Sequence, residues 1–211
     1  VSAHPWRYLI AGVLVLGLLA APAFAMRLGI PDNGASPQSL TTRQAYDLLA
    51  DGFGPGFNGP LILAADLGDA TVDDLVPMAE AVAADPGVQA VAPVVPNEDG
   101  TAAVLRVIPT TSPQDERTTD LVHHLRSDII PEATAGTGAE VYVGGQTATF
   151  IDMSDKVADR LPYFVGAVIL LSVILLMMVF RSVAVPLKAA AMNLLSIGAA
   201  YGVIVAVFQW G

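Results

Sequence analysis

The chain has 211 residues, of which 54% are hydrophobic, contains no cysteine and carries a formal net charge of −10 at pH 7. The acidic excess repels nucleic-acid phosphates, so it excludes a nucleic-acid partner, and without cysteine no disulfide can stabilise the fold. All 20 acidic residues lie between Arg27 and Arg160, so the segments on either side contain no carboxylate side chain.

Three long uncharged runs flank or follow this acidic region. Tyr8–Met26 has 19 residues, Leu161–Phe180 has 20 and Ala189–Gly211 has 23. About 20 apolar residues cross the hydrocarbon core of a bilayer, so each run is long enough to span it. We therefore predict transmembrane helices over 8–26, 161–180 and 189–211, the last one truncated, with a cytoplasmic link over 181–188.

The distribution of basic residues predicts the orientation. Residues 27–160 hold 7 basic and 20 acidic residues, a net −13, whereas the flanks hold 3 basic residues and no acid. Those three are Arg7, Arg181 and Lys188, and basic residues beside short membrane segments favour the cytoplasmic side. We predict a multi-pass protein of the bacterial plasma membrane with residues 27–160 extracytoplasmic. Ala23-Phe24-Ala25 also matches a signal-peptidase site, so cleavage of residues 1–25 is an alternative that leaves the domain outside as well.

The acidic domain alternates between short helical and strand patterns. The pattern predicts, in chain order, a helix over 41–50, a strand over 61–67, a helix over 72–84, strands over 88–95 and 102–108, a helix over 115–133, a strand over 140–143 and a helix over 146–160. After the first helix this order is β-α-β-β-α-β, the ferredoxin-like unit. The predicted fold class is α+β: a membrane protein with transmembrane helices and a ferredoxin-like βαββαβ extracytoplasmic domain.

The glycine-rich segment Phe53–Gly59 joins the first helix to the first strand. It lacks the lysine of a phosphate-binding loop and precedes a strand rather than a helix, so we interpret it as a turn. The functional alternative is a flexible lip whose Phe53 and Phe57 bind an apolar substrate.

Small and polar residues occur together in the third apolar run. Gly198 and Gly202 have the spacing that permits close helix packing. Asn193, Ser196 and Tyr201 either pack against neighbouring helices or line a path for water or protons.

No arrangement of residues indicates an enzyme, a metal site or a cofactor. His123 and His124 are neighbours on a predicted helix and point about 100° apart, so one metal ion cannot easily bind both. Asp115 and Glu116 lie near a helix start, where carboxylates favour the positive end of the helix dipole. We therefore predict no catalytic residue, no metal ligand and no cofactor.

Four segments together resemble the MMPL family of the RND transporter superfamily. They are Thr41–Pro60 (TTRQAYDLLADGFGPGFNGP), Val141–Thr147 (VYVGGQT), Phe180–Lys188 (FRSVAVPLK) and Met192–Trp210 (MNLLSIGAAYGVIVAVFQW). The resemblance implies one helix, a periplasmic porter domain and the next two helices from the second half of such a transporter.

The resemblance also implies a proton-driven exporter of lipids or hydrophobic small molecules. Its expected partners are the bilayer, a hydrophobic or lipid substrate and the remainder of the transporter chain, with a homo-oligomer possible. The family relays protons through Asp-Tyr pairs in other helices, and none of the three runs here contains an acid. The alternative is a non-transporting accessory membrane protein whose outer domain binds a partner, such as a protein-export subunit.

Overall fold

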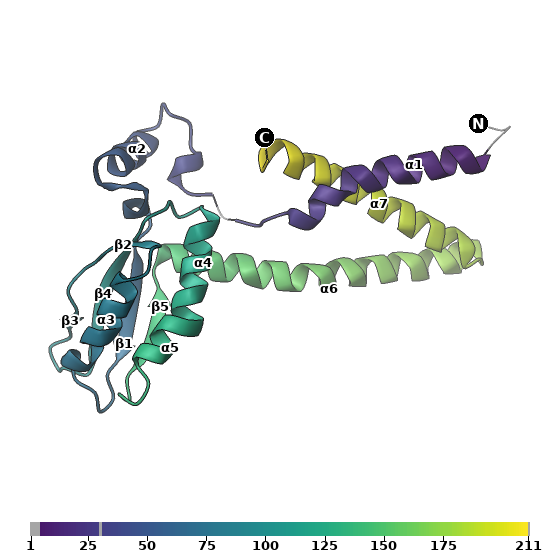
Figure 1. Ribbon diagram of the computed structural model, residues 1–211. Coiled ribbons are helices and arrows are strands. Elements are labelled where there is room, and N and C mark those ends of the chain that lie inside the picture. Colours follow the sequence, from purple (N-terminus) through teal and green to yellow (C-terminus); the bar gives the residue numbers. More distant parts are fainter. Residues whose placement is uncertain (1–4, 30, 211) are drawn as a thin grey trace. The chain divides into compact units, whose positions relative to one another are not determined.

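Figure 1 shows the computed structural model, which describes residues 5–29 and 31–210. The chain divides into two compact units, one over Gly29–Lys156 and the other formed by the segments on either side. Helix α6 (Gln146–Phe180) begins in the first unit and continues in the second without a break.

The second unit contains long apolar helices. Helix α1 spans Pro5–Ala20, continues as the 3-10 turn η1 (Ala21–Ala25), and α7 spans Ala184–Phe208. The change to a 3-10 turn coincides with Pro22, which cannot donate a helical hydrogen bond. The segments Trp6–Ala25, Gln146–Phe180 and Ala184–Phe208 are each long and apolar enough to cross a membrane.

Helices α1 and α7 approach closely at two glycines. A Cβ atom on Gly202 would lie 1.9 Å from the carbonyl oxygen of Leu19, and one on Gly198 would lie 3.2 Å from Ala20 Cβ. At the end of α7, the Gln209 amide donates to the carbonyl of Ala25 at 3.1 Å and accepts from the Arg27 amide at 3.2 Å. The small residues therefore serve helix packing, as the packing interpretation of the sequence predicts.

The first unit is built on an antiparallel sheet in the order β2-β4-β1-β5, with β3 also paired to β4. The strands are β1 (Leu61–Asp66), β2 (Val88–Val91), β3 (Val95–Pro96), β4 (Ala102–Pro109) and β5 (Glu140–Gly144). Both β1 and β2 pair antiparallel to β4, so they run parallel to each other with β4 between them. This is the split βαβ arrangement, and it confirms the predicted fold class.

One face of the sheet carries the core. Along β1, Leu61, Leu63 and Ala65 are buried, as the two-residue period of a strand requires. Helices cover that face in Figure 1: α3 (Val76–Ala83), α4 (Glu116–His124) and α5 (Ile130–Ala133). Apolar side chains of these helices join the strands in one buried cluster.

Three predicted elements differ in detail from the structure. The helix predicted from Val72 begins with the 3-10 turn η4 (Val72–Leu75), where Asp74 accepts hydrogen bonds from Thr71. The strand predicted over 88–95 is two short strands, β2 and β3, with Pro93 between them. The helix predicted over 115–133 contains the π segment η5 (Leu125–Ile129), which links α4 to α5.

Candidate functional site

The chain before β1 folds into a small structure that we call the cover, residues 31–59. It consists of η2 (Asn33–Ala35), α2 (Thr41–Phe53) and η3 (Pro55–Asn58). Helix α2 ends at Gly54, whose φ of 103° is one that side-chain-bearing residues rarely adopt. No residue of α2 is buried, so the helix has no apolar anchor of its own.

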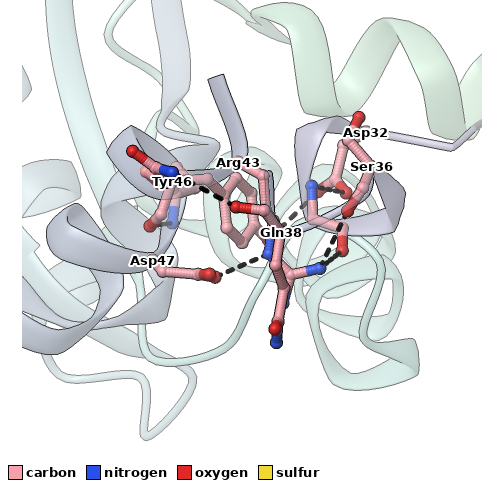
Figure 2. Close-up of polar contacts among 9 residues, drawn as sticks. Asp32, Ser36, Gln38, Arg43, Tyr46 and Asp47 are labelled. Atoms are coloured by element: carbon pink, nitrogen blue, oxygen red, sulfur yellow. Dashed lines mark hydrogen bonds and ion pairs between the residues drawn. The ribbon is translucent and has the colours of Figure 1, made fainter. Parts of the chain in front are cut away.

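Polar groups hold the cover together, as Figure 2 shows. The Arg43 guanidinium donates to Asp47 at 2.8 Å and to the carbonyls of Gly34 and Ser36. The Asp32 carboxylate accepts from the Gly34 amide at 2.9 Å and thereby caps η2. The hydrogen bonds of the Arg43 guanidinium therefore all join residues within the cover.

Tyr46 links α2 to η2. Its hydroxyl donates to Asp32 Oδ2 at 3.1 Å. Burial, followed by the nearby Asp32 carboxylate, raises the pKa of Tyr46 to about 12. The phenol therefore stays protonated at any physiological pH and remains a hydrogen-bond donor.

Three hydrogen bonds attach the rest of the cover. The Asn58 amide donates to the carbonyl of Tyr46 at 3.0 Å and so ties η3 to α2. The Thr147 hydroxyl, at the start of α6, donates to the carbonyl of Gly59 at 3.0 Å. The Gln89 amide donates to the carbonyl of Phe53 at 2.8 Å. The cover is thus connected to β2 and α6 by polar contacts.

A cleft of about 760 Å³ lies between the cover and the start of α6. This volume is within the range of small-molecule sites. One wall comes from the cover, and the opposite wall comes from the loop after β4 and the first turns of α6. The lining residues are Pro31, Asp32, Asn33, Ala35, Ser36, Pro37, Thr42, Ala45, Tyr46, Leu49, Phe57, Asn58, Pro113, Gln146, Thr147 and Phe150.

The lining of the cleft contains both apolar and polar residues. Ala45, Leu49, Phe57 and Phe150 supply apolar surface, and Leu49 is 41% exposed. The Phe57 ring lies 5.4 Å, centroid to centroid, from the ring of Phe53, which is 59% exposed. The structure therefore brings the two predicted phenylalanines together, with Phe57 in the cleft and Phe53 beside it.

The three polar residues singled out on α7 differ in burial from its packing residues. Gly202, which lies against Leu19 of α1, is buried. Asn193, Ser196 and Tyr201 are exposed, and within residues 5–29 and 31–210 their side chains have no polar partner. Their role in a water or proton path remains a prediction.

The two histidines point to different partners. His123 Nε2 lies 3.0 Å from Asp155 on α6, and His124 Nδ1 lies 2.9 Å from Asp85 in the turn after α3. Within the described ranges, no three His, Cys, Asp or Glu side chains form a group that could hold a metal ion. Asp115 caps α4 by accepting from the Arg117 amide at 3.0 Å, which is the structural role predicted for it.

Sequence reasoning identified Phe57 but missed the rest of the cleft. Asp32 and Tyr46 lie on one wall, whereas Gln146, Thr147 and Phe150 lie on the other, about 100 residues further along the chain. No local pattern relates the two walls. The apolar i, i+4 spacing of Ala45, Leu49 and Phe53 was the only available signal that α2 presents an apolar face.

Comparison with known proteins matches this chain to one family of membrane proteins. The sequence profile of the MMPL family matches residues 64–211. Membrane protein YdfJ of Bacillus subtilis is 38% identical over the whole of this chain, which corresponds to 29% of its own length.

Two mycobacterial relatives also align with the whole chain. The mycolic acid-containing lipids exporter MmpL11 of Mycolicibacterium smegmatis is 34% identical, and the aligned part is 23% of that protein. The heme uptake protein MmpL11 of Mycobacterium tuberculosis is 32% identical, over 22% of its length. The chain therefore spans less than a third of the length of these relatives.

Proposed function

Because this chain belongs to the MMPL family, we propose that it is part of a proton-driven membrane exporter of lipids or hydrophobic small molecules. The family assignment makes the chain a multi-pass membrane protein, in keeping with its three long apolar helices. Within the transporter, the cleft would hold the apolar part of a cargo molecule, with Phe53 and Phe57 as contacts.

The observation that carries this proposal is the exposed apolar surface at the cleft. Leu48, Leu49, Phe53 and Phe57 are between 36% and 73% exposed and lie on the cover. An exposed apolar cluster beside a cavity is typical of a binding site, because a ligand can remove that surface from water. The lipid exporter among the relatives supports the same cargo class.

The proposal is tested by transport in cells that carry the full-length transporter. Phe57→Ser should lower the export of an apolar fluorescent dye several-fold, because it removes an aromatic contact from the cleft. Val104→Ser is the matched control, since Val104 is 47% exposed on β4 and does not line the cleft. Equal export by both variants and the parent would contradict a cargo site in the cleft.

The direction of transport and its energy source need a separate experiment. Dissipating the proton gradient with a protonophore should stop export by the full-length protein. Export that continues at the same rate would contradict the proton-driven mechanism. Net accumulation of the dye would assign uptake instead, the direction that the name of the M. tuberculosis heme uptake protein gives for that relative.

Helix α6 offers a route for coupling between cleft and membrane. It contributes Thr147 and Phe150 to the cleft and runs without interruption into the apolar segment that ends at Phe180. A continuous helix transmits a displacement along its axis, so a movement of the membrane segment would alter the cleft.

Coupling through α6 is tested with a flexible insertion. Gly-Ser residues inserted between Lys156 and Val157, beyond the cleft residue Phe150, should abolish export, because they break the helix between cleft and membrane. The same insertion in the Asn97–Gly100 turn serves as the control, since that turn lies between β3 and β4. Export that survives the first insertion would rule out rigid coupling.

A further inference from the structure

In the part of the chain that the structure describes, the residues that line the cleft include an acidic side chain but no basic one. Among the described residues that line it, Asp32 is the only one with a charge at neutral pH, and none is Lys, Arg or His. The guanidinium of Arg43 lies nearby in Figure 2, but its bonds go to Asp47 and to the carbonyls of Gly34 and Ser36. A bound molecule therefore meets a carboxylate without a free cation beside it.

Asp32 is held in place from two sides. Its Oδ1 accepts from the Gly34 amide at 2.9 Å, and its Oδ2 accepts from the Tyr46 hydroxyl at 3.1 Å. Both contacts involve neutral donors, so they fix the position of the carboxylate without cancelling its charge. Each oxygen keeps a lone pair that a ligand donor can use.

Neutral polar groups also line the cleft. Asn33, Ser36 and Gln146 line it, and their side chains have no partner among the described residues. Together they offer both donors and acceptors, which a hydroxyl group can satisfy from either side. A sulfate or a fully ionised phosphate has acceptors only, and a quaternary ammonium forms no hydrogen bonds.

We propose that Asp32 sets the charge selectivity of the cleft: it admits amphiphiles with uncharged, hydroxyl-bearing head groups and rejects those with anionic head groups. The apolar chain of such a molecule lies along Leu49, Phe57 and Phe150, and its hydroxyls face Asp32. This inference rests on the proposed function, since it assumes that the cleft is where cargo binds.

Three photoreactive probes with the same alkyl-diazirine chain test the proposal. Their head groups are a glucoside, a phosphate and a trimethylammonium, and the full-length transporter is reconstituted in nanodiscs of neutral phosphatidylcholine. Cross-linked peptides are quantified by mass spectrometry. Labelling of α1 and α7 corrects for differences in membrane partitioning, because all three alkyl chains enter the bilayer.

In the parent chain, the glucoside should label the α2–η3 and Gln146–Phe150 peptides at least about fivefold more than the phosphate does, the factor expected from like-charge repulsion near a surface. Asp32→Asn keeps the shape and the acceptor oxygen but removes the charge. It should bring phosphate labelling to within about twofold of glucoside labelling. Asp51→Asn is the matched control, because Asp51 is exposed on α2 and does not line the cleft.

The possible failures are distinguishable. Equal labelling by glucoside and phosphate in the parent, or no effect of Asp32→Asn, overturns the role of Asp32 and leaves the cleft as a cargo site. An equal effect of Asp51→Asn assigns the selectivity to overall charge and overturns it as well. Strongest labelling by the ammonium probe overturns the uncharged head group. Cleft labelling no stronger than that of the Asn97–Gly100 turn overturns both the selectivity and the proposed function.

Discussion

Gly56 lies so close to the end of β4 that a side chain there cannot be accommodated without movement. A Cβ atom would lie 1.7 Å from the carbonyl oxygen of Pro109, a backbone atom that cannot rotate away. Gly52, four residues earlier on α2, has no atom within 4 Å of the corresponding position. The two glycines of one short segment therefore serve different purposes.

Substituting these glycines should have opposite effects. Gly56→Ala should destabilise the junction of η3 with β4 by ~2 kcal/mol or more, because backbone atoms must shift. Gly52→Ala should be neutral or stabilise α2 by ~0.5–1 kcal/mol, since alanine favours a helix interior. Hydrogen exchange of the amides in Ala102–Pro109 measures the first effect. Unchanged protection of these amides in Gly56→Ala would contradict the close approach.

Asp152 on α6 forms an ion pair with Arg126. Both of its oxygens accept from the Arg126 guanidinium, which also donates to the carbonyl of Val143 at 2.7 Å. The hydrogen bond from Arg126 lowers the pKa of Asp152 below its ordinary value of 3.8. A lowered pKa stabilises the folded state at pH values above 3.8, and this contribution is lost as the pH falls through the lowered value.

Asp152→Asn should therefore lower the thermal unfolding temperature at pH 7 and have less effect as the pH falls below 3.8. The expected loss at pH 7 is only ~0.5 kcal/mol, because the pair is largely exposed to solvent. Calorimetry of the parent and the variant between pH 7 and pH 3 measures the difference. A difference that grows on acidification has the wrong sign for this ion pair.

At the scale of elements, the contact between α1 and α7 depends on the absence of side chains. Because the chain contains no cysteine, an introduced pair can report this contact without background. Ala20→Cys with Gly198→Cys should form a disulfide, since the Cβ positions are 3.2 Å apart and small shifts bring them into bonding range. Gly202→Leu added to this pair should reduce cross-linking strongly, because its Cβ would meet the backbone of Leu19.

The control for this experiment is Gly12→Leu in the same double-cysteine chain. Gly12 lies on α1 and has no atom within 4 Å of its Cβ position, so the yield of disulfide should not change. If Gly202→Leu also leaves the yield unchanged, the two helices do not pack at this point.

The periodic elements could be predicted from the sequence, and their irregularities could not. The apolar run over 61–67 indicates a strand, which the structure confirms over Leu61–Asp66. Which face is buried could not be predicted, because Ile62 and Ala64 are apolar as well. The π segment was missed although Pro131 lies only two residues beyond it. In a regular helix the ring of Pro131 would crowd the carbonyl of Ser127, and the structure instead has a wider turn in which the Ile130 amide donates to the carbonyl of Leu125.

The candidate site was less predictable than the fold. Glycines in Phe53–Gly59 indicate a turn by themselves, and the positive φ of Gly54 agrees with that interpretation. The cleft, however, depends on α2 and the first turns of α6 lining the same cavity, and this placement arises from the tertiary fold. The proton-path residues Asn193, Ser196 and Tyr201 remain predictions, because the described part of the chain gives them no polar partner.

At the scale of the whole molecule, the charge asymmetry predicts how the chain crosses the membrane. Single cysteines report this orientation. Ala135→Cys, in the exposed loop before β5, should react with an impermeant maleimide in intact cells. Val183→Cys, which is 60% exposed in the link before α7, should react only after the cells are permeabilised. The reverse pattern would invert the predicted topology.

The construction of the cover has a kinetic consequence. Because α2 buries no residue, separating α2 from its neighbours exposes no side chain that is now fully buried, and it breaks the hydrogen bonds from Gln89 and Asn58. Such a segment opens as a local unfolding unit, with a free energy well below that of the sheet. A cargo molecule could therefore enter and leave on the timescale of these openings while Leu61, Leu63 and the rest of the core remain folded.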